Sequence, residues 1–232
     1  MKKAATHIWM VLLVIATCHS SARSAEVTAT IKIQHPESRS VSPADVVVWL
    51  TPIDSPITRA PIRASAKLLQ KDKQFHPHLL VVPTGTSVEF PNMDPFFHNV
   101  FSLFNGKRFD LGLYETGTHR SVTFDREGVS YIFCNIHPEM AAIVITLNSP
   151  WFATSDSRGA VIIRDVPPGR YRVHIWAEQL ALVLPTNDGE IISVPAEKYE
   201  MGSIEFRPIR SSLAHHKNKF GKDYAPETSS PY

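Results

Sequence analysis

Four side chains that bind transition metals lie in two short stretches of this sequence. Cys134, His137 and Met140 follow one another at intervals of three residues, directly after an apolar run, and His98 lies upstream in a separate stretch. A thiolate, two imidazoles and a distant thioether make up the ligand set of mononuclear blue-copper sites. We therefore expect His98, Cys134, His137 and Met140 to bind one type 1 copper ion.

Other interpretations of the same residues remain open. Zinc could be bound by His98, Cys134 and His137, but zinc sites do not recruit methionine. Taken alone, Met140 could be a core filler and Cys134 a small buried apolar residue. The Cys-x-x-His-x-x-Met pattern directly follows a strand-like run and has a His-Asn pair upstream, and this placement favours copper. A closed four-ligand site leaves no open position for a substrate, so we do not expect an enzyme.

Apolar runs predict the strands that must position these ligands, at residues 79–82, 87–90, 121–124, 129–134 and 142–147. A strand that ends at Cys134 would direct its sulfur inward, and the following turn would bring His137 back to the same centre. His98 must come from a separate loop, because a rigid site needs ligands fixed by independent parts of the fold. Asn99 is expected to tie the two loops together through hydrogen bonds at the sulfur.

Strand patterns also flank this region. Residues 26–34 alternate between apolar and polar side chains, residues 46–50 form an apolar run, and short strands separated by Pro-Pro-Gly recur after residue 150. No stretch keeps a helical period over ten or more positions. The sequence predicts an all-β protein, with a Greek-key β-sandwich over residues 26–149, a second small β-sandwich over 150–210 and a disordered tail over 211–232.

The first 25 residues have the pattern of a secretory signal peptide. Lys2 and Lys3 precede a short apolar run, which is followed by small residues. That run is shorter than the ~20 residues that span a bilayer, so we expect cleavage between Ala22 and Ala25 and a periplasmic protein without a membrane span. The alternative is a lipoprotein signal in which Cys18 carries the lipid, and the threonine before Cys18 fits that poorly.

Removal of this leader changes the charge and the cysteine content. It takes three of the 24 basic residues, so that 21 face 22 acidic ones and the net charge falls from +2 to about −1. The mature chain would have no overall attraction for nucleic acid. Cys134 becomes the one remaining cysteine, although exported proteins normally use cysteines in disulfide pairs. A metal-bound thiolate explains such a lone thiol.

Residues from about 75 to 147 resemble the plastocyanin- and azurin-type cupredoxins, and among them most closely the amicyanins, through the Cys-x-x-His-Pro-x-Met spacing of residues 134–140. The resemblance implies that His98 and His137 are imidazole ligands, Cys134 the thiolate ligand and Met140 the long axial ligand. It also places Asn99 at the asparagine that hydrogen bonds near the sulfur in that family.

The rest of the chain carries further resemblances. The whole sequence is similar to bacterial proteins called methylamine utilization proteins. The trailing unit resembles a carboxypeptidase regulatory-like domain, through Gly159 and the run Asp165-Val166-Pro167-Pro168-Gly169-x-Tyr171. Simple cupredoxins lack both this unit and the N-terminal extension, so the docking surface need not match theirs.

These observations lead to one expected function and two alternatives. We expect a periplasmic copper protein that carries single electrons between redox partner proteins, such as a cytochrome or a dehydrogenase, and that has no small-molecule substrate. A copper carrier or storage protein would use the same thiolate and thioether ligands, because both suit Cu(I). A binding module without redox activity, in which the copper site is vestigial, is the second alternative.

Overall fold

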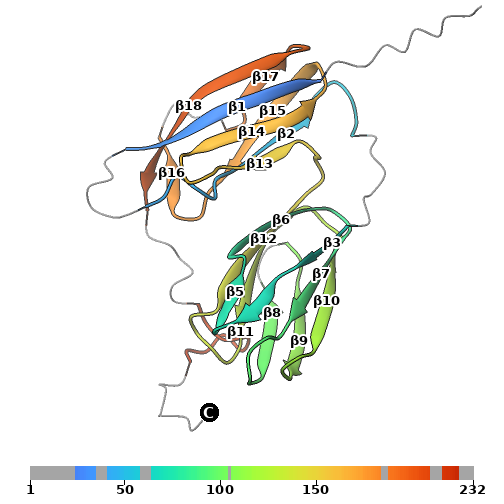
Figure 1. Cartoon of the computed structure of the whole chain (residues 1–232), viewed down its shortest axis with the longest axis vertical. Coiled ribbons are helices and arrows are strands. Elements are labelled where there is room, and N and C mark those ends of the chain that lie inside the picture. The colour runs from blue at the N-terminus through green and yellow to red at the C-terminus, as the bar shows by residue number, and fades with distance from the viewer. Residues whose placement is uncertain are drawn as a thin grey trace, which may run out of the picture.

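The structure is all-β, as the sequence predicts. The computed structural model describes residues 24–34, 41–57, 64–103, 106–183, 188–209 and 216–224, and every regular element in these ranges is a strand. The strands form two lobes stacked along the long axis of the molecule (Figure 1). No helix within the described ranges is long and apolar enough to cross a membrane. The expected leader lies outside these ranges, apart from its last two residues.

One lobe, here called the metal-binding sandwich, contains the strands from β3 to β12. Its five-stranded sheet has the order β6-β12-β11-β8-β9, and a three-stranded sheet, β10-β7-β3, faces it. A short hairpin of β4 and β5 completes the lobe. The strands are β3 (Ser65–Lys67), β4 (Leu69–Lys71), β5 (Gln74–His76), β6 (Leu79–Pro83), β7 (Thr86–Pro91), β8 (His98–Ser102), β9 (Phe109–Tyr114), β10 (His119–Phe124), β11 (Gly128–Cys134) and β12 (Ala141–Leu147).

Side-chain alternation explains where the core of this lobe lies. Along β7, buried and partly exposed residues alternate strictly, so that Val88 and Phe90 point inward. They pack in one cluster with Val144 of β12 and with Cys134 and Met140. Two of the expected ligands, Cys134 and Met140, therefore belong to the core of the sandwich, where packing restricts their movement.

The other lobe, the companion sandwich, takes strands from both ends of the chain. Its sheets have the orders β14-β1-β18-β16 and β13-β2-β15-β17. The strands are β1 (Ala25–Ile33), β2 (Val47–Pro52), β13 (Phe152–Thr154), β14 (Ala160–Val166), β15 (Gly169–Trp176), β16 (Leu180–Leu182), β17 (Ile191–Val194) and β18 (Lys198–Pro208).

This arrangement differs from the expected division of the chain at residue 150. We expected residues 26–149 to form one domain, but β1 pairs with β14 and β18, and β2 pairs with β13 and β15. The physical reason is that one face of β1 is apolar and needs a core, and the companion sandwich supplies it. The metal-binding sandwich is thus inserted between two strands of its neighbour and the rest of that neighbour.

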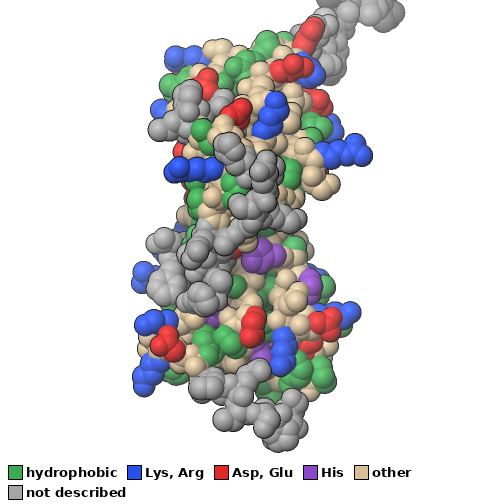
Figure 2. Space-filling model, turned by 90° about the vertical axis from the view of Figure 1, so that its left-hand side faces the viewer, with side chains coloured by type: hydrophobic (Ala, Val, Ile, Leu, Met, Phe, Trp, Pro, Cys, Tyr) green, Lys and Arg blue, Asp and Glu red, His purple; other side chains and the backbone are tan. Residues whose placement is uncertain are grey.

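The two lobes share an apolar interface. Ile143, Ile145 and Leu147 project from the side of β12 that faces away from the metal-binding core, and they pack with Val47 of β2. Partly buried aromatic side chains complete this cluster, namely Trp49, Tyr131, Phe152 and Trp176. Because β12 serves a core on each side, nearly all of its residues are buried. Away from this interface, Figure 2 shows acidic and basic side chains interspersed over both lobes.

An ion pair also joins the lobes. His78 Nε2 lies 2.7 Å from Glu178 Oε2, and His78 Nδ1 lies 3.1 Å from the carbonyl oxygen of Ala141. The hydrogen bond to Glu178 raises the pKa of His78 above its ordinary value of 6.5, whereas burial lowers it. The negative charges of Glu178 and Asp45 and the hydrogen bond to the Ala141 carbonyl raise this pKa further. With both ring nitrogens next to oxygen acceptors, the protonated imidazole fits this position best.

We predict that this ion pair makes stability depend on pH. A raised folded-state pKa stabilises the protein fully below pH 6.5, and the contribution is lost as pH rises through the pKa of folded His78. Since the imidazole is half-exposed, the effect should not exceed about 1 kcal/mol. Urea unfolding of the wild type and Glu178→Gln between about pH 5.5 and pH 8.5 measures it. Glu115→Gln, at an exposed position, is the control; equal pH slopes in wild type and Glu178→Gln would contradict the prediction.

The C-terminal part of the chain also differs from expectation. We expected residues 211–232 to be disordered, yet residues 216–224 lie against the metal-binding sandwich, as the red segment beside β11 in Figure 1 shows. The ring of His216 stacks on Phe133 at a centroid distance of 4.2 Å. The prediction of disorder rested on the polar composition of this segment, which gives no sign of the ring contacts that His216 makes. Residues 211–215 and 225–232 lie outside the described ranges.

Candidate metal centre

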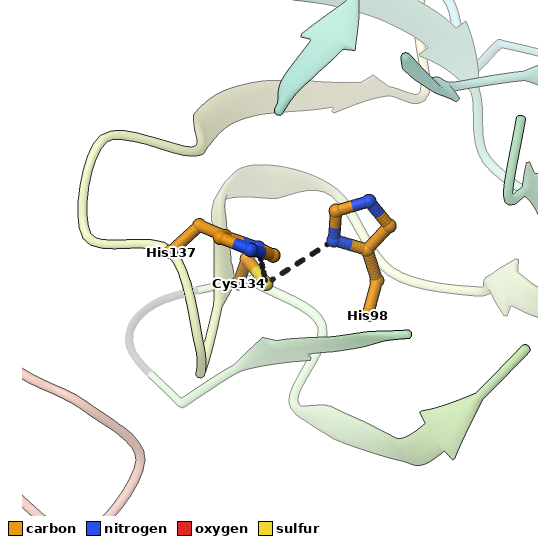
Figure 3. Close-up of side chains that lie close together, drawn as sticks. All are labelled: His98, Cys134 and His137. Carbon is orange, nitrogen blue, oxygen red and sulfur yellow. Dashed lines mark hydrogen bonds between the residues drawn. The ribbon is translucent and has the colours of Figure 1, made fainter. Parts of the chain in front are cut away.

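Three of the four expected ligands meet at one end of the metal-binding sandwich. Cys134 Sγ lies 3.6 Å from His98 Nδ1 and 3.5 Å from His137 Nδ1 (Figure 3). Suitable donor atoms of the three residues all lie within 4.8 Å of one another. This spacing fits a single transition-metal ion bound by one sulfur and two imidazole nitrogens.

Strand pairing brings these residues together. His98 begins β8 and Cys134 ends β11, and the two strands are antiparallel neighbours in the same sheet. The N–H of Asn135 donates to the carbonyl oxygen of Asn99, which extends the contact beyond the paired residues. His98 and Cys134 are thus adjacent because β8 and β11 are paired.

A tight turn places His137 and Met140. The Met140 N–H donates to the His137 carbonyl oxygen at 3.2 Å, and the Cys134 N–H donates to the Met140 carbonyl oxygen at 3.1 Å. These bonds close the loop between β11 and β12 on itself. The intervals of three residues therefore correspond to one hydrogen-bonded turn whose two ends are fixed by strands.

The environment of Cys134 suits a metal-bound thiolate. The side chain is fully buried, and burial raises the pKa of its thiol, while the backbone N–H groups of Asn99, Ile136 and His137 act in the opposite direction. Without metal the thiol stays protonated near neutral pH. If a metal ion displaces the proton, these three backbone N–H groups are already directed at the sulfur and stabilise its negative charge.

A carboxylate fixes the orientation of His98. The Nε2–H of His98 donates to Asp94 Oδ2 at 2.9 Å, which leaves Nδ1 as the free lone pair facing Cys134. Burial lowers the pKa of His98, and Asp94 opposes this shift. His98 is fully buried and Asp94 nearly so. The imidazole is accordingly a neutral ligand in the tautomer that a metal requires.

Asp94 is in turn held by a hairpin turn. The N–H groups of Asp72 and Lys73 donate to Asp94 Oδ1 and Oδ2 at 2.6 Å and 3.0 Å. Both residues have positive φ, 57° and 55°, and form the two-residue turn between β4 and β5. This role of Asp94 was not predicted from the sequence. The Asp-x-x-x-His spacing before β8 is the signal that could have indicated it.

His137 is the more accessible of the two imidazoles. It is partly buried, and its ring lies 5.0 Å from that of His98. Phe96 packs against both rings at centroid distances of 5.3 Å. Burial lowers the pKa of His137, and the neighbouring His98 and Lys73 lower it further. Like His98, it is therefore ready to bind a metal as the neutral imidazole.

The other two expected residues lie close to the centre. Met140 is fully buried in the same apolar cluster as Cys134, and its role as a ligand remains a prediction. Asn99 contacts the other ligand loop through its backbone: its N–H donates to the cysteine sulfur, and its carbonyl oxygen accepts from the N–H of Asn135 at 2.9 Å. Its side-chain Nδ2 donates to Asp110 Oδ1 at 2.6 Å.

No protein-family model and no curated protein matches this chain. Among solved structures, the purple cupredoxin from Nitrosopumilus maritimus is 26% identical over 35% of this chain and 99% of its own, with a TM-score of 0.33. The Cu-containing nitrite reductase from Thermus scotoductus SA-01 is 24% identical over 42% of this chain and 25% of its own, with a TM-score of 0.35. An oxidized amicyanin variant is 20% identical over 36% of this chain and 83% of its own, with a TM-score of 0.34. All three TM-scores are below 0.5.

Proposed function

We propose that this protein is an exported type 1 copper protein that carries single electrons between redox partner proteins. The convergence of Cys134 Sγ with the Nδ1 atoms of His98 and His137 is the observation that carries this proposal. One soft thiolate and two imidazoles suit copper in both of its common oxidation states. Bound copper would supply the redox chemistry by alternating between Cu(II) and Cu(I).

The residues around the donors favour rapid electron transfer. Asp94 holds the ring of His98, backbone amides hold the sulfur, and the turn from Cys134 to Met140 closes on itself. A site whose ligands are held by packing and hydrogen bonds rearranges little when its charge changes. Such rigidity is of use to an electron carrier, since each transfer then needs little reorganisation.

His137 is the proposed point at which electrons enter and leave. It is the partly exposed ligand, and an exposed apolar side chain directly precedes each of the two histidines. Ile136 directly precedes His137 and is 42% exposed, and Phe97 directly precedes His98 and is 54% exposed. Exposed apolar side chains at such a position suit brief contact with a partner protein, here proposed to be a cytochrome or a dehydrogenase.

The remaining parts of the proposal concern the axial ligand, the location and the absence of catalysis. Met140 would be the weak fourth ligand, because it is fully buried in the same apolar cluster as Cys134 and thioethers are the weak ligands of such sites. The signal-peptide pattern of residues 1–25 supports export to the periplasm. With four protein ligands the site would bind no substrate, which favours a carrier over an enzyme.

Optical and electrochemical measurements on the purified, copper-loaded protein test this function. We expect an intense thiolate-to-copper band in the visible range and reversible one-electron reduction with retention of the metal. A colourless Cu(II) form would refute the proposal. Ready release of Cu(I) to a competing metal-free acceptor would instead favour copper carriage.

Replacing Met140 by leucine separates an axial ligand from a core filler. Leucine nearly conserves volume, so the fold should be retained. We expect the protein to stay coloured and its reduction potential to rise, because loss of a weak donor destabilises Cu(II) more than Cu(I). Voltammetry measures this change, and Met201→Leu in β18 of the companion sandwich is the matched control. An unchanged potential in Met140→Leu would show that Met140 only fills space.

A further inference from the structure

Residues 216–224, here called the C-terminal strap, contact the strand and loop that carry Cys134. The hydroxyl of Tyr224 donates to the carbonyl oxygen of Cys134 at 2.7 Å. The Tyr224 ring meets the ring of His216 edge to face, and His216 stacks on Phe133. Two aromatic side chains of the strap thus lie over consecutive residues at the end of β11.

A second group of contacts reaches the neighbouring loop. The backbone N–H of Lys219 donates to Asn135 Oδ1 at 3.0 Å, and Lys219 Nζ lies 2.7 Å from Asp110 Oδ2. The other oxygen of Asp110 accepts from the side chain of Asn99. Asn99 follows His98, and its backbone N–H is one of the donors at the cysteine sulfur. The strap therefore connects to both stretches that provide metal ligands.

These contacts have a specific chemical consequence for the cysteine. A donor on the Cys134 carbonyl withdraws electron density from the residue that binds the metal, and it also holds the backbone at that residue. The ammonium group of Lys219 is paired with the Asp110 carboxylate, so it adds little net charge near the site. The weaker electron donation from Cys134 favours the reduced state of a metal centre, because the oxidised state depends more on that donation.

We infer that the C-terminal strap is a functional part of the metal centre and that Tyr224 is a positioning residue for Cys134. The strap raises the reduction potential of the centre and slows the loss of its metal. This inference rests on the proposed copper function and adds to it an element from the far end of the chain. It also gives a role to Tyr224 in an otherwise polar C-terminal segment.

Tyr224→Phe in the full-length, copper-loaded protein tests the inference, because it removes the hydroxyl and keeps the ring. We expect a lower reduction potential in voltammetry and about fivefold faster removal of copper by a Cu(I) chelator, the factor that corresponds to a typical net hydrogen bond. Lys222→Ala, an exposed position on the same strap, is the control and should match the wild type in both measurements.

A measurement without metal provides a second readout. In the metal-free protein, iodoacetamide should alkylate the buried Cys134 thiol about fivefold faster in Tyr224→Phe than in the wild type, because the loop end is less firmly held. If the wild type is blue and Tyr224→Phe matches it in potential, copper loss and alkylation, the inference is overturned and the proposed function stands. A colourless wild-type protein would overturn the proposed function itself.

Discussion

Replacing Cys134 by serine will abolish the visible thiolate-to-copper band and weaken copper binding by at least about 100-fold, since loss of a mere hydrogen-bond partner of a ligand already costs roughly 10–100-fold. The sulfur lies 3.5–3.6 Å from both imidazole Nδ1 atoms, so its removal takes away the soft donor at the centre of the site. A hydroxyl is a poor ligand for Cu(I) and has no low-energy charge-transfer band with Cu(II).

The fold should survive this change. Serine is close in size to cysteine, and its oxygen would accept hydrogen bonds from the same backbone groups of Asn99, Ile136 and His137. We expect the free energy of unfolding of the metal-free variant to lie within about 1 kcal/mol of that of the metal-free wild type. Copper titration against a competing chelator, with absorption spectra, measures the main effect. An unaltered visible spectrum in Cys134→Ser would disprove the ligand assignment.

Asp94→Asn is expected to weaken copper binding by about 10–100-fold. The two oxygens of Asp94 accept from the N–H groups of Asp72 and Lys73 and from His98 Nε2. Asparagine offers one oxygen and turns an NH₂ group toward one or more of these donors. In either orientation of the amide, His98 loses the charged acceptor that fixes its tautomer and its ring orientation.

This substitution also tests whether the carboxylate acts through charge or only through packing. Loss of a buried acceptor should cost about 1–3 kcal/mol in the free energy of unfolding, apart from the effect on copper. Asp125→Asn on the same sandwich is the control, because Asp125 forms an exposed ion pair with Lys107 that contributes little. Chelator competition and urea unfolding measure both effects. Equal copper affinities in Asp94→Asn and Asp125→Asn would contradict the role assigned to Asp94.

The proposed ligand set could be predicted from the sequence because its chemistry is local. Cys134, His137 and Met140 occupy one turn, and the residue types alone indicate a soft-metal site. His98 was expected to come from a separate stretch of chain, and the pairing of β8 with β11 is what brings it beside Cys134. The strand pattern was equally local, because alternation follows from one face being buried.

The parts that could not be predicted depend on partners distant in sequence. Alternation in residues 25–33 shows that one face of β1 is buried but not which sheet the strand joins, so its place in the companion sandwich was missed. Asp94 is held in place for His98 by the turn at Asp72 and Lys73, which lies about twenty residues earlier in the chain. The strap is held by the contacts of Tyr224 and His216 with β11. Neither amino-acid composition nor side-chain periodicity predicts such contacts.

The insertion of one sandwich within the other has a consequence for the order of folding. All strands of the metal-binding sandwich lie between β2 and β13, whereas β1 must await β18 at the other end, as the pairing of Glu26 with Lys198 shows. Pairings of such long range form slowly, while contiguous ones form early. A chain that emerges N-terminus first can therefore bring His98, Cys134 and His137 together while the neighbouring sandwich is still open, and the C-terminal strap reaches this site last.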